Sequence, residues 1–311
     1  MSNTYILRKG RSSIHDLTDG GAVDGYPGDY PGRIYFVNNI TGASGNDGLS
    51  WRNAFDEVST AITAAEAYRA TFGATNVYIR NMIYVQGTGT AYSHLHALPN
   101  YCDIVGIGAN PRGNGSGIAS ISSITGHNSA DDSGTAGVRG LGLYNLQFTG
   151  AGTGYGLDVS VMFRSTIENC VFVNKSTGGI RIVKGGGLTI RNCQIGGGDT
   201  VNSGNGLENS GTDNFNDCLI EDNFISGTAY GVIVNAYLCN ATLFRNNTIY
   251  GATEGVHDTC ADSNILANAW YSDNFIMGAD AMVLTNNSAA RTLHNYVNNG
   301  TNGVVENEAT P

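Results

Sequence analysis

The sequence predicts an all-β fold, a single-stranded parallel β-helix, and two interleaved repeats carry that prediction. The first repeat is an apolar residue, then Asn or a substitute two places later, then another apolar residue three places after that. Its seven central residues stand at steps of 24, 23, 30, 24, 27 and 21 residues: Asn145, Asn169, Asn192, Asp222, Asn246, Asp273 and His294. Two interleaved repeats that share a period of roughly 20 to 30 residues are typical of a solenoid.

The second repeat is a Gly followed by alternating apolar residues, and it lies between copies of the first. Its members begin at Gly156, Gly179, Gly206, Gly231, Gly255 and Gly303, with Asp280 in the place of Gly before Met282 and Leu284. These apolar runs are short and follow a period of two, which indicates strands. Since no helical pattern separates them, each repeat is predicted to be one coil, with every strand paired to its copy about 4.8 Å away.

The Asn positions have a physical reason in this arrangement. A sharp bend between two strands favours a residue that tolerates the left-handed backbone region, and Asn does so. We therefore expect the seven central residues to line up along one bend, where the amides of successive coils can hydrogen-bond to each other.

The same phrases resemble a known superfamily. Bends of the form Ile-x-Asn-x-x-Ile, as at Ile190, Asn192 and Ile195, alternate with strands such as Gly179-Ile180-Arg181-Ile182. They are similar to the right-handed β-helix superfamily that includes pectate lyases, over most of the chain from about residue 34. The resemblance implies a right-handed coil. It implies no single activity, because that superfamily holds lyases, hydrolases, epimerases, phage tailspikes and non-enzymatic virion proteins.

The chain divides into three predicted segments: an extended arm over residues 1–33, a first strand and capping helix over 34–76, and the parallel β-helix over 77–311. One apolar face predicts the helix, with Ser50 as N-cap and Gly73 at its end; its members are Trp51, Phe55, Val58, Ile62 and Ala65. A solenoid must cover its open end, so this helix is predicted to form the N-terminal cap.

The arm combines an apolar run with a basic cluster, and these residues are the predicted partner-binding site: Tyr5, Ile6, Leu7, Arg8, Lys9 and Arg11. An extended segment of this kind can add a strand to the sheet edge of another protein. The alternative is that the arm packs on its own solenoid.

Charge is unevenly distributed along the chain. Up to Arg191 there are 14 Lys and Arg against 13 Asp and Glu, a net of +1; after it there are 2 against 13, a net of −11. The acidic coils argue against nucleic acid or an anionic membrane as a partner. No apolar stretch of membrane-spanning length and no signal peptide is recognised, so synthesis in a cytoplasm is expected.

Neither a metal nor a cofactor is predicted. Cys170 and Cys193 occupy equivalent positions in adjacent coils, as buried thiols or as a disulfide, and no Cys-x-x-Cys spacing occurs. His94 and His96 lack an evident third ligand.

The best candidate for catalysis is a carboxylate pair on the outer face of the Gly-led strands. Asp158 and Glu208 lie two coils apart, roughly 9.6 Å, near the upper end of the separation in inverting glycosidases. Arg181 lies between them, so the three residues are either catalytic or an ion triad that stabilises the solenoid. Alternating charges on a second outer column, at Glu168, Arg191, Glu221 and Arg245, favour the structural role.

These observations predict a non-enzymatic structural protein of a bacteriophage virion, assembled in the host cytoplasm. The specific hypothesis is a homo-oligomeric capsid decoration or cement protein, held by its arm to the major capsid protein or another virion protein. A tail-associated component is close behind. The alternative is a carbohydrate-active or carbohydrate-binding β-helix protein, such as a short tailspike depolymerase. An adhesin is a third hypothesis, disfavoured by the missing signal peptide.

Overall fold

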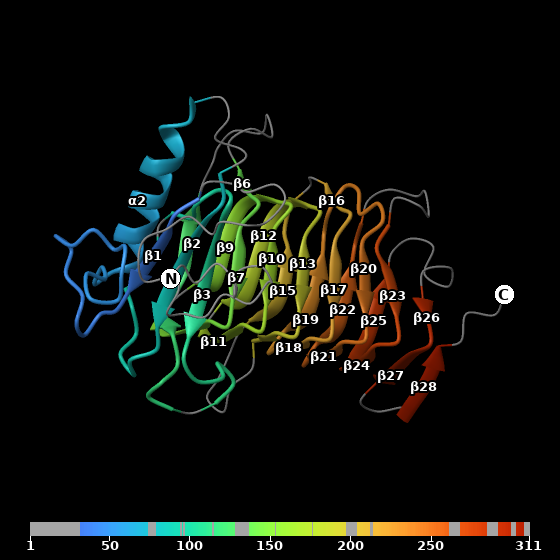
Figure 1. Cartoon of the computed structure of the whole chain (residues 1–311). Helices are drawn as coiled ribbons and strands as arrows, with labels where there is room; N and C mark the ends of the chain where they lie inside the picture. The colour runs from blue at the N-terminus through green and yellow to red at the C-terminus, as the bar shows by residue number, and fades with distance from the viewer. Residues whose placement is uncertain are drawn as a thin grey trace, which may run out of the picture.

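The chain coils into a right-handed parallel β-solenoid whose strands form three sheets along its length (Figure 1). The computed structural model describes residues 32–307, except 74–78, 94, 96, 114, 128–136, 153, 176, 197–203, 212–213, 261–267, 285–291 and 300–302. The arm residues 5–11, together with His94 and His96, therefore lie outside the described residues.

Sheet A has ten strands and begins at the N-terminal end of the solenoid. Its strands are, in order, β1 (Ile34–Val37), β2 (Asn81–Gln86), β3 (Cys102–Ile107), β7 (Gly142–Tyr144), β10 (Thr166–Glu168), β13 (Thr189–Arg191), β17 (Leu219–Glu221), β20 (Leu243–Arg245), β23 (Trp270–Ser272) and β26 (Thr292–Leu293). All neighbouring strands in it are parallel, and β1 is already part of the solenoid because it pairs with β2.

Sheets B and C complete each coil. Sheet B contains β4 (Ser120–Ile121), β8 (Gln147–Gly152), β11 (Val171–Lys175), β14 (Gln194–Ile195), β18 (Phe224–Gly227), β21 (Thr248–Gly251), β24 (Phe275–Gly278), β27 (Asn295–Asn299) and β28 (Gly303–Asn307). Sheet C contains β5 (Ile124–His127), β9 (Tyr155–Phe163), β12 (Gly178–Gly186), β15 (Asn205–Asn209), β19 (Tyr230–Val234), β22 (Glu254–Asp258) and β25 (Asp280–Leu284). The short strands β6 (Val138–Arg139) and β16 (Phe215–Asn216) pair with β9 and β12.

The interior is filled by the inward residues of the alternating strands. Identical or similar side chains stack from coil to coil, as in the column Ile190, Ile220, Phe244 and Tyr271, all fully buried. Aromatic rings stack in the same way: Phe148 and Phe172 lie 4.6 Å apart with nearly parallel planes. The apolar residues that alternate along each strand therefore pack, from coil to coil, into one continuous core.

The N-terminal end is covered by α2 (Val58–Ala70), which packs Val58, Ala61, Ile62 and Ala65 onto the first strands. The predicted helix began too early, since its N-cap is Glu57 and not Ser50. The residues before α2 instead bind the outer edge of β1: Phe36 donates its N–H to the carbonyl of Gly48, and Phe55 donates to that of Phe36. These hydrogen bonds pair the backbone groups on the open edge of β1. The segment that contains Trp51 and Phe55 forms this edge contact, and therefore lies before the helix.

The seven residues of the bend column all have positive φ, between 50° and 57°. Their flanking strands are in register, so the residues lie along one edge of the solenoid between sheets A and B. Asn169 donates its side-chain amide to Asn145 at 3.0 Å, and Asn246 donates to Asp222 at 2.5 Å. Left-handed backbone therefore recurs at the same corner of each coil.

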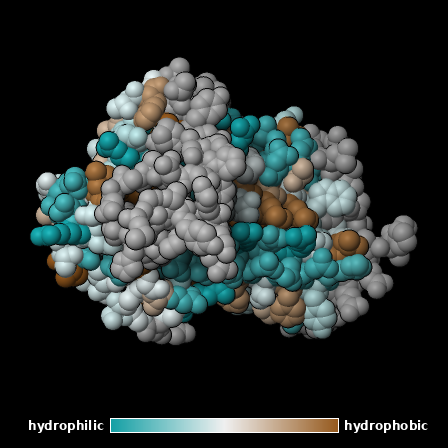
Figure 2. Space-filling model, in the orientation of Figure 1, coloured by the Kyte–Doolittle hydropathy of each residue, from teal (hydrophilic) through white to brown (hydrophobic). Residues whose placement is uncertain are grey.

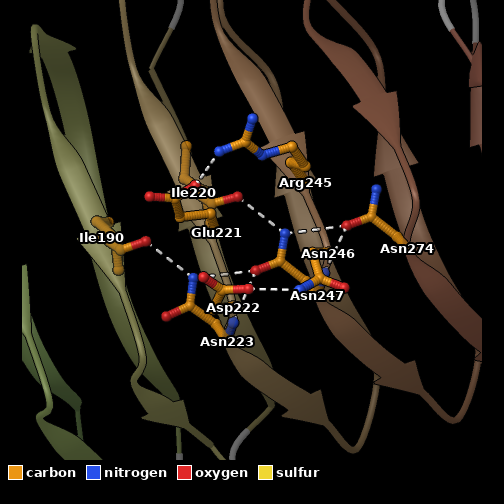
Figure 3. Close-up of polar contacts among 9 residues, drawn as sticks. All are labelled: Ile190, Ile220, Glu221, Asp222, Asn223, Arg245, Asn246, Asn247 and Asn274. Carbon is orange, nitrogen blue, oxygen red and sulfur yellow. Dashed lines mark hydrogen bonds and ion pairs between the residues drawn. The ribbon is translucent and has the colours of Figure 1, made fainter.

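A second column of asparagines lies one residue further on and inside the solenoid (Figure 3). It consists of Asn223, Asn247, Asn274 and Asn295, all buried. Oδ1 of Asn247, Asn274 and Asn295 each accepts both the backbone N–H and the Nδ2 of the asparagine one coil earlier, at 2.9 to 3.0 Å. Oδ1 of Asn223 accepts the backbone N–H of Cys193 at 2.9 Å. In the two preceding coils the same position is held by Cys170 and Cys193, which are buried free thiols.

The lead glycines of sheet C are required by close packing between coils. A Cβ at Gly231 would lie 2.6 Å from the carbonyl oxygen of Gly255, and a Cβ at Gly255 would lie 2.5 Å from that of Ala281. The residue that takes the Gly place in the last coil is Ala281, and the assignment of Asp280 to it was wrong, because Asp280 pairs with Glu254.

The C-terminal strand also departs from the predicted register. The repeat placed Gly303 and Val304 in the Gly-led column, but β28 turns back and runs antiparallel to β27 in sheet B, pairing Val305 with Val297. It therefore ends sheet B by pairing with its last parallel strand, and it adds no coil to sheet C.

Candidate functional site

The outer face of sheet C gathers the ionisable residues that could bind or transform a ligand. Two columns of outward side chains run along it, three residues apart in each strand. The first column contains Tyr155, Gly178, Asn205, Tyr230, Glu254 and Asp280, and the second contains Asp158, Arg181, Glu208, Ile233, His257 and Val283. The predicted residues Asp158, Arg181 and Glu208 are consecutive members of the second column.

Arg181 pairs with Asp158 in a two-pronged ion pair. Its Nε donates to Oδ1 at 2.8 Å and its Nη2 donates to Oδ2 at 2.7 Å. These hydrogen bonds raise the pKa of Arg181. The guanidinium also lies over the ring of Tyr155, 4.9 Å from its centroid. Both oxygens of Asp158 are thus occupied by a permanent cation, which suits a structural pair better than a proton-transfer group.

Glu208 is held by different partners. The hydroxyl of Tyr155, two coils earlier, donates to Glu208 Oε2 at 2.5 Å, and Asn205 Nδ2 donates to the same oxygen at 2.6 Å. Burial and this bond to Glu208 raise the pKa of Tyr155. The expected triad is therefore unsymmetrical: Arg181 forms its ion pair with Asp158, while Glu208 is bound by a hydroxyl and an amide.

A third cluster, Tyr230, Glu254 and His257, lies two coils further along the same face. His257 Nδ1 is 2.6 Å from Glu254 Oε2, and the rings of His257 and Tyr230 are 5.2 Å apart. In the tautomer in which Nδ1 donates to Glu254, the neutral imidazole presents Nε2 to a ligand as a hydrogen-bond acceptor. Side chains of Glu254 and His257 are partly accessible to solvent.

Sequence reasoning missed Tyr155, Asn205 and Glu254. The signal was present: each is the residue directly before the Gly that leads its strand. That position faces outward beside the residue three places later, because the lead Gly and the apolar residue after it are both buried.

Sheet A carries further ion pairs on its outer face. Arg191 donates to Glu168 at 2.8 Å, and Arg245 pairs with Glu221 (Figure 3). Each bond joins one coil to the next, so the alternating charges link neighbouring strands of sheet A. Exposed pairs of this kind contribute little to stability, because solvent screens them.

Within the described ranges, no three His, Cys, Asp or Glu residues come together as a group able to hold a metal ion. Over the same residues, no helix is long and apolar enough to cross a membrane.

Comparison with known proteins gives one remote similarity in structure. No family model matches the sequence, and no curated protein matches it significantly. Among solved structures, the chain is similar to the crystal structure of the Dettilon tailspike protein, with 11% identity and a TM-score of 0.34. The alignment covers 89% of this chain and 55% of the tailspike, so the chain spans about half the length of that protein.

Proposed function

We propose that this protein is a non-enzymatic structural component of a bacteriophage particle. Its specific role is that of a capsid decoration or cement protein, with a place in the tail as the nearest variant. The arm attaches it to the major capsid protein or to another virion protein, and the solenoid projects from the particle.

The observation that carries the non-enzymatic assignment is the bidentate bond between Arg181 and Asp158. An acid and base pair needs one carboxyl group with a raised pKa and room for substrate between the two. Here both oxygens of Asp158 are bound by the guanidinium of Arg181 in the adjacent coil. Glu208 accepts two hydrogen bonds, from Tyr155 and Asn205 on the same sheet face. The geometry favours an ordered surface over a reaction centre.

The attachment assignment rests on sequence and on the boundary of the solenoid. Arg33 belongs to the solenoid, because its N–H donates to Asn81 Oδ1 at 2.8 Å and its guanidinium lies 4.1 Å from the ring centre of Tyr68. Residues 1–15 contain three basic residues, Arg8, Lys9 and Arg11, and no Asp or Glu. A basic, partly apolar segment before an acidic body provides both orientation and affinity for an acidic partner.

Deletion of residues 2–31 tests this assignment while keeping the contacts of Arg33. The truncated protein should retain its β-sheet circular dichroism and its melting temperature, yet be missing from particles purified from cells that carry the altered gene. Arg8→Ala, Lys9→Ala and Arg11→Ala combined should reduce incorporation without removing the apolar run. Normal incorporation of the truncated protein would show that attachment uses another surface.

The absence of enzymatic activity is tested separately. The purified protein should not depolymerise neutral or acidic polysaccharides, measured by reducing ends and by the ultraviolet absorbance of unsaturated sugars. Depolymerisation that is abolished by Asp158→Asn or Glu208→Gln would overturn the proposal.

The cluster of Tyr230, Glu254 and His257 favours a second candidate function, glycan binding. A tyrosine ring next to hydrogen-bonding groups on an outer face suits a sugar ring. Glycan-array binding that is lost in His257→Ala and retained in Arg181→Met would support it, and would place the site three coils from Arg181 and four from Asp158.

A further inference from the structure

Cys170 and Cys193 occupy equivalent positions in adjacent coils, inside the bend between sheets A and B. The residue pairs on both sides of them are in register: Glu168 with Arg191 in sheet A, and Val171 with Gln194 in sheet B. The Cα atoms of the two cysteines therefore lie about one strand spacing apart, roughly 4.8 Å. Disulfides join cysteines whose Cα atoms are about 4.4 to 6.8 Å apart, so the backbone already has the spacing of a disulfide.

The sulfur of Cys193 reaches back to the coil of Cys170. It accepts the backbone N–H of Cys170 at 3.5 Å, and its thiol donates to the carbonyl of Ile167 at 3.6 Å. The thiol of Cys170 is turned toward the coil before, where it lies 3.5 Å from the carbonyl oxygen of Leu143. Rotation of the Cys170 side chain toward Cys193 is therefore the main movement that a bond between the two sulfur atoms requires.

Thiols are weak substitutes for the asparagines that hold this position in the following coils. Oδ1 of Asn223 accepts the N–H of Cys193 at 2.9 Å, and its Nδ2 donates to the carbonyl of Ile190 at 2.9 Å. Cys193 offers the N–H of Cys170 only a sulfur atom at 3.5 Å, and sulfur is a weak acceptor. A covalent bond between the two coils is what cysteine can form here and asparagine cannot.

We infer that Cys170 and Cys193 are a redox pair, free thiols in a reducing compartment and a disulfide between adjacent coils after exposure to a hydroperoxide. One thiolate attacks a peroxide oxygen, which gives a sulfenic acid and, from hydrogen peroxide, hydroxide. The second thiol attacks the sulfenic sulfur, so that the S–S bond forms and water leaves. Two electrons and two protons thus pass from the thiols to the peroxide, which becomes two water molecules. The inference is independent of the virion assignment.

Oxidation of this pair should be slow, because the pair is enclosed. Both cysteines are fully buried, and burial raises the pKa of Cys170, so its reactive thiolate is rare. Figure 2 shows hydrophilic residues in a band across the outer face of sheet A. The ion pair between Arg191 and Glu168 on this face joins the same two coils. A small oxidant is therefore required, and hydrogen peroxide is the probe that fits.

Peptide mapping of the full, unaltered chain tests the bond. The folded protein is treated with hydrogen peroxide for well beyond the time that oxidises the accessible thiol of Tyr237→Cys, a position that is 53% exposed. Remaining thiols are blocked in denaturant, and the chain is cleaved by trypsin together with a protease that cuts after Asp and Glu. Cys170 and Cys193 then fall in separate peptides, residues 169–175 and 192–199. These two peptides should be found linked, and reduction should separate them.

The number of thiols measured in denaturant gives a second readout. It should fall by two, from six to four, in the unaltered protein, and should stay at five in Cys193→Ser. Cys218→Ser is the matched control, because Cys218 is also a buried free thiol outside the pair. In this control the number should again fall by two, from five to three.

Thermal melting measures what the bond does. The disulfide closes a loop from residue 170 to residue 193 and restricts the unfolded chain, so the melting temperature of the unaltered protein should rise by about 5 °C. A reducing agent should reverse the rise, and Cys193→Ser should show none. An unaltered protein that keeps six thiols after this treatment overturns the inference. A link found only between other cysteines, such as Cys239 and Cys260, also overturns it.

Discussion

Asn223 and Asn247 lie in adjacent coils and are hydrogen-bonded to each other inside the solenoid. The backbone N–H and the Nδ2 of Asn223 both donate to Asn247 Oδ1, each at 3.0 Å. Nδ2 of Asn223 also donates to the carbonyl of Ile190, and Nδ2 of Asn247 donates to that of Ile220 (Figure 3). The amides of Asn223 and Asn247 therefore each satisfy one backbone acceptor and one backbone donor, both at the bend of the preceding coil. Buried polar groups so connected specify register as well as contributing stability.

Replacing Asn247 by Leu should lower the free energy of unfolding by about 3 kcal/mol. The substitution keeps an interior side chain of similar size but leaves the N–H of Asn223 and the carbonyl of Ile220 without these partners. Urea denaturation followed by circular dichroism measures the loss. Asn246→Gly is the control, since it alters the neighbouring outward position, and should change stability by less than about 1 kcal/mol. A loss at Asn247 no larger than in this control would show that the buried column is dispensable.

The backbone of the bend should decide which residues are accepted at Asp273. Its φ is 56°, a value that Gly and Asn adopt with little cost and a β-branched residue does not. Asp273→Asn and Asp273→Gly should be close to neutral, whereas Asp273→Val should reduce stability by about 1 to 2 kcal/mol. Thermal melts of the three variants check the order, and a Val variant as stable as the Gly variant contradicts it.

The thiols should be unreactive in the native protein. All six cysteines are buried, and burial raises the pKa of Cys102 and raises that of Cys218 to about 12. Because the thiolate is the reacting form, a disulfide reagent at pH 8 should release almost no chromophore from the folded chain and six equivalents from the chain in denaturant. Tyr237→Cys should release one equivalent without denaturant. Rapid reaction of the unmodified native protein would show that the coils open locally.

Stability should decrease in alkaline solution through groups such as Tyr92. Burial raises the pKa of Tyr92 to about 12 from 10.0, and its hydroxyl donates to the carbonyl of Gln86 at 2.7 Å. Since the folded pKa is the higher one, this contribution to stability is complete below pH 10 and is lost as the pH rises through 12. Urea midpoints measured from pH 9 to pH 12 should fall less steeply for Tyr92→Phe. Equal slopes for the two proteins would exclude a role for Tyr92.

The sequence by itself determined the coil. Apolar residues at period two, the spacing of positions such as Asn169 and Asn192, and the lead glycines are local consequences of strands, bends and close packing, so each is readable without coordinates. A helix near residue 60 was predictable for the same reason. Its first residue was not, because the edge of β1 takes Gly48 and Phe55 as hydrogen-bonding partners before the helix starts.

Only the tertiary structure decided which of two adjacent bend residues enters the core. Asp222 and Asn223 differ little in sequence terms, yet the positive φ of Asp222 turns the chain so that Asn223 lies buried. Likewise, the alternation of charges did not reveal that Arg181 binds Asp158 and leaves Glu208 to Tyr155. Side-chain length and direction decide such pairings, and they depend on residues from three coils that approach each other only after the solenoid has formed.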